Sequence, residues 1–355
     1  MEIVRGLHQV KTPFPTPALP YVLAYIFECD DGVGLFDAGF GTPEATAALT
    51  AELAKLGRQP SDIRRIMISH AHPDHYGMTP WIREQSPDCD VVMLAREWQW
   101  VVDRWMDNTG WTALSDQWLV RHGLPVAEIE EAHRQGALGP GSPRVEASAA
   151  GAPASAAPRN EGGATPPLGR FIEPNIKLQD GDTFEFDRWS FQAVWTPGHT
   201  PGHLCMFERG ERVMFTGDHV LPYISPNVSL HADQEGTSPL SDFRESLAKV
   251  AAFKPRLALP AHEFTIGDLP HRCDVLFHHH DGRLEEVLAA VGDGAPVTAR
   301  EISMRVAWNT GPFEDFNLFM KRSALGETLS HLQLLQDEER VRRIEGNDRV
   351  TWAKA

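Results

Sequence analysis

Short apolar runs separated by turn signals fill the start of the chain, a pattern that is typical of β-strands. Residues 21–27 and 33–36 are apolar and flank an Asp-Asp-Gly sequence, so they predict a β-hairpin. Thr42 and Pro43 then predict the cap and the first residue of a helix. The next apolar run, 66–68, predicts a buried strand, so the order is strand, strand, helix, strand.

Further apolar runs continue this alternation to about residue 260. They predict strands at 88–94, 176–178, 183–186, 191–195, 212–216 and 257–259. Several of these runs end within four residues of a histidine or an aspartate. Ligand and catalytic groups are often placed where a strand gives way to a loop, so these strand ends are the first places to look for chemistry.

The strand that ends near Ser69 leads into three histidines and one carboxylate within six positions. Imidazole is the commonest protein ligand for zinc, and a carboxylate suits a second divalent ion. His70 and His72 can converge on one metal, while Pro73 turns the chain and displaces Asp74 and His75 sideways. Clustered histidines on a surface loop usually bind nothing, so this spacing alone is only a first indication of a two-metal site.

The same arrangement recurs at later strand ends. A Thr-Pro-Gly-His sequence ends at His199, a Thr-Gly-Asp sequence ends at Asp218, and a Pro-Ala-His sequence ends at His262. With His70, four separate predicted strand ends each present a histidine or an aspartate. Independent coincidence is a poor explanation for this repetition, so the sequence predicts that these side chains meet.

These four motifs, in their order and spacing, resemble those of the metallo-β-lactamase-fold hydrolases. The motifs are His-x-His-x-Asp-His at 70–75 and the three that end at His199, Asp218 and His262. The resemblance spans about residues 1–270 and is specific to the superfamily rather than to a substrate. It implies an α/β fold, an αββα sandwich in which two sheets lie face to face with helices outside, and a dinuclear site along one edge.

The resemblance also implies a role for each residue of the site. Three histidines resemble the ligands of the first metal: His70, His72 and His199. Three further residues resemble the ligands of the second: Asp74, His75 and His262. Asp218 resembles the bridging carboxylate, and Asp37 resembles the aspartate that orients a ligand, although a turn-forming Asp37 is an equal alternative. We expect two divalent ions, Zn²⁺ before Fe or Mn, with room for substrate.

Residues 96–133 form a predicted helical lid that is rich in tryptophan. Its five tryptophans are Trp98, Trp100, Trp105, Trp111 and Trp118. Tryptophan suits either helix packing on the main domain or the wall of an apolar substrate pocket, and both interpretations stay open. The Ala, Gly, Pro and Ser of residues 135–170 predict a flexible insertion without chemistry of its own.

Residues 271–355 are predicted to form a small winged-helix-like α+β domain after the 1–270 domain. Their pattern gives three helices and then a hairpin, and this tail is similar to that of the lactamase-β-2-like branch, which contains nucleases and thioester hydrolases. Asp and Glu outnumber Lys and Arg, 13 against 10, in residues 275–355. This disfavours nucleic acid and favours packing or homodimer formation. We interpret His278 to His280 as a helix surface rather than a third metal site.

Composition narrows the class of protein further. The 355 residues carry a formal net charge of -16, which also disfavours a nucleic-acid footprint. The four cysteines lack CxxC spacing and predict buried, reduced thiols. The first residues do not have the pattern of a signal peptide, and the sequence lacks a long apolar stretch, so we expect a cytoplasmic protein away from membranes.

The predicted function is hydrolysis by a hydroxide that bridges the two metals. The expected substrate is a small ester, thioester or lactone with a partly apolar group, and the thioester of a CoA-like or glutathione-like carrier comes first. Asp74, His203 and Tyr223 are the candidate catalytic residues, with a hydrogen bond to a ligand and a pocket wall as alternatives for His203 and Tyr223. Two other functions stay open, an endoribonuclease or other phosphodiesterase and a mononuclear iron persulfide dioxygenase.

Overall fold

Two β-sheets and the helices around them make up the first part of the protein. The computed structural model describes residues 1–16, 19–106, 110–134 and 171–355, so the predicted 135–170 insertion lies outside the described residues. The first sheet has the strand order β1 (Glu2–Val4), β2 (Leu7–Pro13), β3 (Tyr21–Cys29), β4 (Gly32–Phe36), β5 (Ile63–Met67), β6 (Asp90–Leu94) and β7 (Ile176–Leu178). Strands β1 to β4 pair antiparallel, and β4 to β7 pair parallel.

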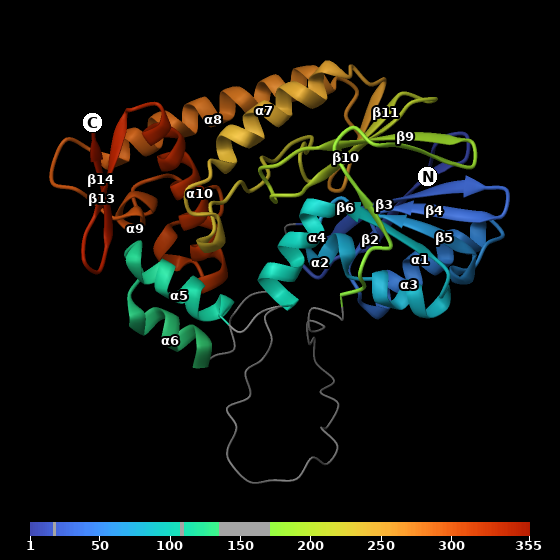
Figure 1. Ribbon diagram of the computed structural model, residues 1–355, viewed down its shortest axis with the longest axis horizontal. Helices are drawn as coiled ribbons and strands as arrows, with labels where there is room; N and C mark the ends of the chain where they lie inside the picture. Colours follow the sequence, from blue (N-terminus) through green and yellow to red (C-terminus); the bar gives the residue numbers. More distant parts are fainter. Residues whose placement is uncertain (17–18, 107–109, 135–170) are drawn as a thin grey trace, which may run out of the picture.

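The second sheet has five strands and faces the first (Figure 1). Its order is β12 (Leu257–Pro260), β11 (Val213–Gly217), β10 (Leu204–Glu208), β9 (Trp189–Trp195) and β8 (Thr183–Phe186). Strands β11 and β12 pair parallel, and the other neighbours pair antiparallel. The sequence analysis places no strand at β10, although Leu204–Glu208 is a largely apolar run of the kind that a central, doubly covered strand has.

Side chains that alternate along the strands build the core of this sandwich. In β3, Tyr25 and Phe27 point between the sheets, while Ala24 and Ile26 belong to the outer apolar cluster. The Phe27 ring centroid lies 5.2 Å from that of Phe215 on the opposite sheet. Aromatic rings at this separation stabilise the contact between the two sheets.

Helices cover both outer faces, so the αββα architecture and the α/β class predicted from the motifs are confirmed. The first sheet is covered by α1 (Pro43–Lys55) and α3 (Thr79–Gln85), and the second by α7 (Pro239–Ala252) and α8 (Leu269–Val291) (Figure 1). Thr42 caps α1 as predicted, because its hydroxyl accepts the backbone N–H of Ala45 at 3.3 Å. The sequence analysis does not include α7.

The tryptophan-rich segment divides into two parts with different neighbours. It contains α4 (Ala95–Val101), the π-helical turn η2 (Val102–Met106), α5 (Trp111–Arg121) and α6 (Val126–Arg134). Helix α4 follows β6 directly, whereas α5 and α6 lie beside the C-terminal elements (Figure 1). Ion pairs hold that second contact, since Lys321 lies 2.7 Å and Arg300 3.5 Å from the carboxylate of Glu128.

The C-terminal region has the predicted order of three helices and a hairpin. Its elements are α8, α9 (Ala299–Ser303), α10 (Leu318–Asp337), β13 (Val341–Glu345) and β14 (Val350–Lys354). The sequence pattern predicts a helix that Thr298 caps and that runs through Trp308, and a long helix over about 324–339. Helix α9 ends earlier, at Ser303, and α10 begins earlier, at Leu318. A winged-helix identity for this region stays a prediction. None of the described helices is both long enough and apolar enough to cross a membrane.

One apolar cluster joins the C-terminal region to the outer face of the second sheet. It contains Met214 of β11, Phe243 of α7 and Leu329 of α10. The predicted surface position of the three consecutive histidines is wrong for His280, which is buried, with its Nδ1 3.2 Å from Nε2 of His331. The reason is that α8 packs against α7 and α10 on the side that carries His280.

Candidate metal centre

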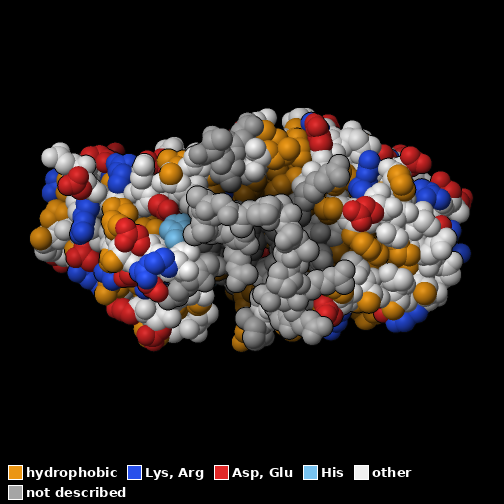
Figure 2. Space-filling model, turned by 90° about the horizontal axis from the view of Figure 1, so that it is seen from below, with side chains coloured by type: hydrophobic (Ala, Val, Ile, Leu, Met, Phe, Trp, Pro, Cys, Tyr) orange, Lys and Arg blue, Asp and Glu red, His pale blue; other side chains and the backbone are white. Residues whose placement is uncertain are grey.

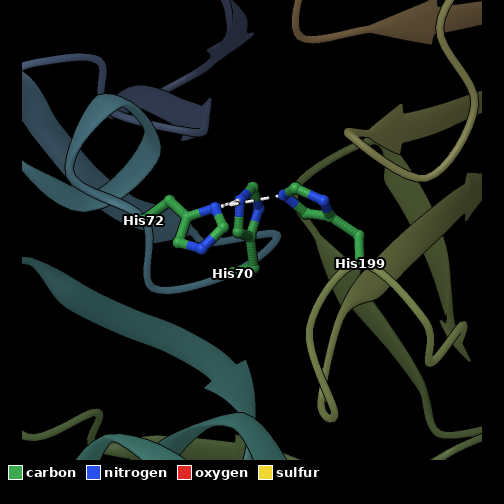
Figure 3. A group of neighbouring side chains, drawn as sticks. All are labelled: His70, His72 and His199. Carbon is green, nitrogen blue, oxygen red and sulfur yellow. Dashed lines mark hydrogen bonds between the residues drawn. The ribbon is translucent and has the colours of Figure 1, made fainter. Parts of the chain in front are cut away.

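The site lies at one edge of the sandwich, in the loops that follow four strand ends. His70 follows β5, His199 follows β9, Asp218 follows β11 and His262 follows β12. Strands from both sheets end at this edge, so side chains far apart in the sequence face one another. In Figure 3, His70 and His72 point from the first sheet towards His199 from the second.

The first donor group consists of His70, His72 and His199. Nε2 of His70 lies 2.9 Å, and Nε2 of His199 3.1 Å, from Nδ1 of His72. Burial lowers the pKa of all three imidazoles, and for His72 it does so to about 3, with neighbouring imidazoles adding to the effect. The rings are therefore neutral at pH 7, and neutral imidazole nitrogens that converge on one point are the donors that a divalent ion such as Zn²⁺ binds.

The second donor group consists of Asp74, His75, Asp218 and His262. Nε2 of His75 and Nε2 of His262 each lie 3.4 Å from an oxygen of Asp74 and 3.4 Å from an oxygen of Asp218. Burial acts to lower the pKa of both imidazoles, but the carboxylates outweigh it and raise the pKa of His75 and, to about 10, that of His262. Four ligand atoms, all within 4.8 Å of one another, surround a volume that suits one ion.

Asp218 lies between the two groups. Its Oδ2 is 3.6 Å from Nε2 of His199 and 3.4 Å from Nε2 of His75, while its Oδ1 faces His262. A carboxylate in this position can bind an ion in each group at the same time. The bridging role that the resemblance implies for Asp218 stays a prediction.

Buried polar atoms without hydrogen-bond partners indicate that the site holds a group other than the protein's own atoms. Nε2 of His75 and Oδ1 of Asp218 are buried and have no hydrogen-bond partner among the described residues. A buried polar atom without a partner costs on the order of 1–3 kcal/mol. Metal ions would satisfy these atoms, so the donor set fits two divalent ions.

Asp37 and Ser69 hold the second group in place. Oδ2 of Asp37 lies 2.8 Å from Nδ1 of His75, and its Oδ1 accepts the backbone N–H of Ser69 at 2.8 Å. Asp37 has a positive φ of 57°, which aspartate tolerates better than most residues. Asp37 therefore makes a tight turn and also orients a ligand, so the two interpretations of this residue are compatible.

His203 lies beneath the site rather than in its opening. Its Nε2 accepts the backbone N–H of Asp218 at 3.2 Å, so Nδ1 carries the proton and donates to Oγ1 of Thr196 at 2.9 Å. The ring is fully buried, and burial keeps its pKa well below the usual value. Both nitrogens are used by the protein, so this geometry favours positioning of Asp218 over contact with substrate.

Tyr223 lies on the loop after Asp218 and is exposed. Its side chain is 80% exposed, and its backbone N–H donates to the carboxylate of Glu263 at 2.8 Å. This bond joins the loop after Asp218 to the loop after His262. A catalytic role for Tyr223 stays a prediction, as do the individual ligand roles of Asp74 and the other donors.

Glu97 is a buried residue of the site that the sequence pattern does not predict. One carboxylate oxygen accepts the N–H of Ala71 at 2.8 Å, and the other accepts the hydroxyl of Thr200 at 2.8 Å and the N–H of Gly202 at 3.0 Å. Glu97 thus joins the loop that carries His70 to the loop that carries His199. Burial raises its pKa to about 7. The sequence signal that could have pointed to Glu97 is the presence of a charged residue within a helix rich in tryptophan.

Comparison with known families identifies the fold and the site together. The family model of the Metallo-beta-lactamase superfamily matches residues 19–262. The chain belongs to the metallo-beta-lactamase superfamily. The matched residues include every member of both donor groups. The superfamily is metal-dependent, which agrees with the unpartnered donors described above.

Related proteins extend the similarity over the whole chain. The probable metallo-hydrolase YqjP of Bacillus subtilis is 25% identical over 336 residues, 94% of this chain and 92% of that protein. The lactamase-like protein vrtG of Penicillium aethiopicum is 29% identical over 129 residues, so the match covers 36% of this chain and 39% of that protein. Together with the family match, these relatives support a metal-dependent hydrolase of the metallo-beta-lactamase superfamily.

Solved structures support the same conclusion. A metallo-beta-lactamase family protein from Thermus thermophilus has a TM-score of 0.77 at 29% identity, and the match covers 100% of both chains. A beta-lactamase domain protein from Burkholderia ambifaria has a TM-score of 0.72 at 22% identity over 100% of this chain and 94% of that chain, which shows a common fold. The C-terminal region therefore also has structural counterparts in other proteins.

Proposed function

We propose that this protein is a dinuclear hydrolase of a small ester, thioester or lactone. The observation that carries the proposal is the position of Asp218 between two complete donor groups. Two divalent ions held there, with Zn²⁺ as the first choice, would supply Lewis acidity at the scissile carbonyl and an activated water. The acyl bond to oxygen or sulfur would break, and the products would be a carboxylic acid and an alcohol or thiol.

The protein residues around the centre would keep its geometry fixed. Asp37 holds the His75 ring through Nδ1, and His203 holds the backbone of Asp218. Glu97 fixes the distance between the loops of the first group. Such preorganisation supports catalysis because ligands need not rearrange as charge develops on the substrate.

A rim of exposed apolar side chains supports a substrate with a partly apolar group. Tyr223 is 80%, Ile224 37% and Phe264 58% exposed, and these residues follow Asp218 and His262 in the chain. The N–H groups of Tyr223 and Ile224 both lie within hydrogen-bond distance of the Glu263 carboxylate, at 2.8 and 3.4 Å. The two loops therefore form one rim, where an acyl or ring group could bind.

Metal analysis combined with a hydrolytic panel tests the proposal. The purified protein is expected to hold two zinc ions per chain and to cleave at least one class among thioesters, esters and lactones. Two ions per chain without turnover of any of these classes would contradict the substrate assignment. One iron per chain with oxygen consumption on a persulfide would favour the dioxygenase alternative instead.

A further inference from the structure

The helix that carries Glu97 also carries a buried arginine. Glu97 and Arg104 lie on the continuous run of α4 and η2, seven residues apart. A helical rise of about 1.5 Å per residue places the backbone of Arg104 roughly 10 Å along the run from that of Glu97, whose side chain contacts the ligand loops. Arg104 is therefore close enough to the metal centre to contact a distal part of a small substrate.

Arg104 lies among three tryptophans with few polar partners. Its guanidinium carbon is 4.8 Å from the ring centroid of Trp100, 5.5 Å from that of Trp105 and 3.9 Å from that of Trp111. The side chain is only 6% exposed, and its Nε and Nη1 have no hydrogen-bond partner among the described residues. Aromatic faces stabilise the cation, but they leave these hydrogen-bond donors unused.

The segment 227–233 connects Arg104 to the first donor group. The backbone oxygen of Asn227 lies 2.8 Å from Nδ1 of His199, and Asp233 lies beside the guanidinium with its Oδ1 3.8 Å from Nη1 of Arg104. Six residues can span at most about 20 Å, so the segment confines Arg104 to the neighbourhood of the metal centre. His231, in the same segment, lies between these two ends.

Helix α10 brings a second arginine, Arg322, to the neighbourhood of the segment 227–233. The hydroxyl of Ser229 donates to the backbone oxygen of Ser323 at 3.2 Å, and the N–H of Leu230 donates to that of Gly326 at 3.0 Å. A Cβ at Gly326 would lie 2.8 Å from Ser229, so the contact is tight. Arg322 adjoins Ser323, and both Arg104 and Arg322 add to the effect of burial in lowering the pKa of His231, as their proximity requires.

The cluster, which we define as Arg104, His231 and Arg322, contains two guanidinium groups, and among the described residues only the carboxylate of Asp233 forms an ion pair with either of them. His231 adds a hydrogen-bonding ring rather than a charge, because burial keeps its pKa well below the usual value. Asp233 is the carboxylate beside Arg104, but its Oδ2 already accepts the indole N–H of Trp100 at 3.1 Å. Asp116, a carboxylate whose charge acts on Arg322, lies 2.8 Å from Nε2 of His133. A buried charge is costly unless it is paired, and the chain as a whole carries a net charge of -16.

The described residues of the face shown in Figure 2 form no broad basic surface. In the face shown in Figure 2, Lys and Arg side chains are interspersed with Asp and Glu at both ends of the molecule. A phosphate backbone would need an extended basic surface, whereas one small anionic group needs only a few donors. The cluster therefore fits a compact anion.

We propose that Arg104, His231 and Arg322 bind an anionic group of the substrate, a carboxylate or a phosphate, while its scissile bond lies at the metal centre. This inference rests on the proposed hydrolase function. The offset of roughly 10 Å between the backbones of Glu97 and Arg104 sets the scale of the separation expected between the scissile carbonyl and the anionic group. Arg donates well to both carboxylate and phosphate, so the two must be distinguished by experiment.

A matched set of thioesters tests the proposal in the metal-loaded protein. The set consists of S-acetyl mercaptohexanoate, its carboxamide, and S-acetyl mercaptohexyl phosphate, which share the scissile bond and differ at the distal group. The wild type is expected to prefer one of the anionic thioesters to the carboxamide by about ten- to hundredfold in kcat/KM. Preference for the carboxylate or for the phosphate identifies the group that the cluster takes.

Variants assign the preference to the cluster. Arg104→Met and Arg322→Met are expected to remove most of the preference, whereas Arg209→Met, which deletes an exposed arginine between β10 and β11, should retain it. A purely structural defect would lower kcat/KM for all three thioesters together and leave their ratio unchanged. An unchanged ratio in both cluster variants, or no preference in the wild type, would overturn the proposal.

Calorimetric binding separates this proposal from the hydrolase assignment. If the wild type cleaves none of the thioesters, the hydrolase assignment for this class fails, and titration of the metal-loaded protein with inorganic phosphate and with hexanoate decides the anion site. Tighter binding to the wild type and to Arg209→Met than to Arg104→Met supports it. Identical titrations in all three proteins overturn it, because metal ions alone would bind the anion equally in each.

Discussion

The run of α4 and η2 links the metal centre to the arginine cluster, because its Glu97 contacts two ligand loops and its Arg104 belongs to the cluster. The two sites differ in how buried charge is paired. In the metal centre, the carboxylates of Asp74 and Asp218 face His75 and His262, so opposite charges lie within 3.4 Å of each other. In the cluster, Arg104 forms an ion pair with a single carboxylate among the described residues, that of Asp233 at 3.8 Å. The metal centre can fold with its charges balanced, whereas the arginine cluster gains a partner for its positive charge only when an anion binds.

Replacing the shared carboxylate should have the largest effect. Asp218→Asn removes a charged donor from both groups, so we expect loss of both ions and a fall in kcat/KM of about a thousandfold or more. His72→Ala should lose the ion of the first group while the second group keeps its four donors. Metal content per chain and kcat/KM measure both effects.

The matched control for these variants is Asp293→Asn, since Asp293 is exposed and pairs with Lys354 at the surface. It should keep both ions and full activity. Full metal content and turnover in Asp218→Asn would show that the residue does not bridge the two groups. Circular dichroism of each variant checks that the fold is kept.

Glu97 should make stability depend on pH. Its carboxyl ionises near 4.5 when the chain is unfolded, but burial raises its pKa to about 7 and keeps it protonated in the folded protein up to that pH. The folded state therefore holds the extra proton between these values, and stability falls as the pH rises through that window. Relative to Glu97→Gln, the wild type should lose up to about 3 kcal/mol of unfolding free energy from pH 4.5 to 7.

Chemical denaturation of both proteins at several pH values measures this difference. Using the difference between wild type and variant removes the contribution of other titrating groups, since these are common to both proteins. A constant difference across the window would mean that Glu97 is ionised in the folded state. It would then hold the two ligand loops together as a charged acceptor.

Asp37 should have an intermediate effect. Asp37→Asn weakens the contact with Nδ1 of His75 and leaves the ligand itself in place. Loss of such an orienting carboxylate typically costs about 10- to 100-fold in metal affinity or activity. Competition with a chelator measures the affinity, and a variant that keeps wild-type affinity would reduce Asp37 to a turn-forming residue.

Asp233→Asn should have the smallest effect, and in the opposite direction. It removes the carboxylate beside Arg104 but keeps an oxygen for the indole N–H of Trp100. The preference for an anionic thioester over its carboxamide should rise by a few-fold, in line with an interaction of about 1 kcal/mol or less. A fall in that preference would place Asp233 in the anion site as a positioning residue.

The sequence pattern was sufficient where local signals repeat. The β3–β4 hairpin, the Thr42 cap of α1 and the four strand ends are each encoded by a few neighbouring residues. Element limits were less accurate in the C-terminal region, where α10 begins at Leu318 rather than at 324. There the helix ends depend on packing against α8 and α9, which the local pattern does not contain.

Buried polar residues show the limit of the sequence pattern. His280 belongs to a run of three histidines that looks like a helix surface, yet it contacts His331 and lies against Phe243. Glu97 looks like a solvent-exposed helical residue but accepts three hydrogen bonds from two ligand loops. Whether such a residue is buried depends on which other element covers it.

The sequence by itself determined the superfamily and the candidate donors, because metal coordination requires particular side chains at particular strand ends. The tertiary structure alone decided that Glu97 joins the ligand loops and that Arg104, His231 and Arg322 come together. Arg104 and Arg322 are separated by more than two hundred residues and belong to different helices. Their charge favours a bound anion only because the side chains are buried. Burial is a property of the packed molecule rather than of any segment.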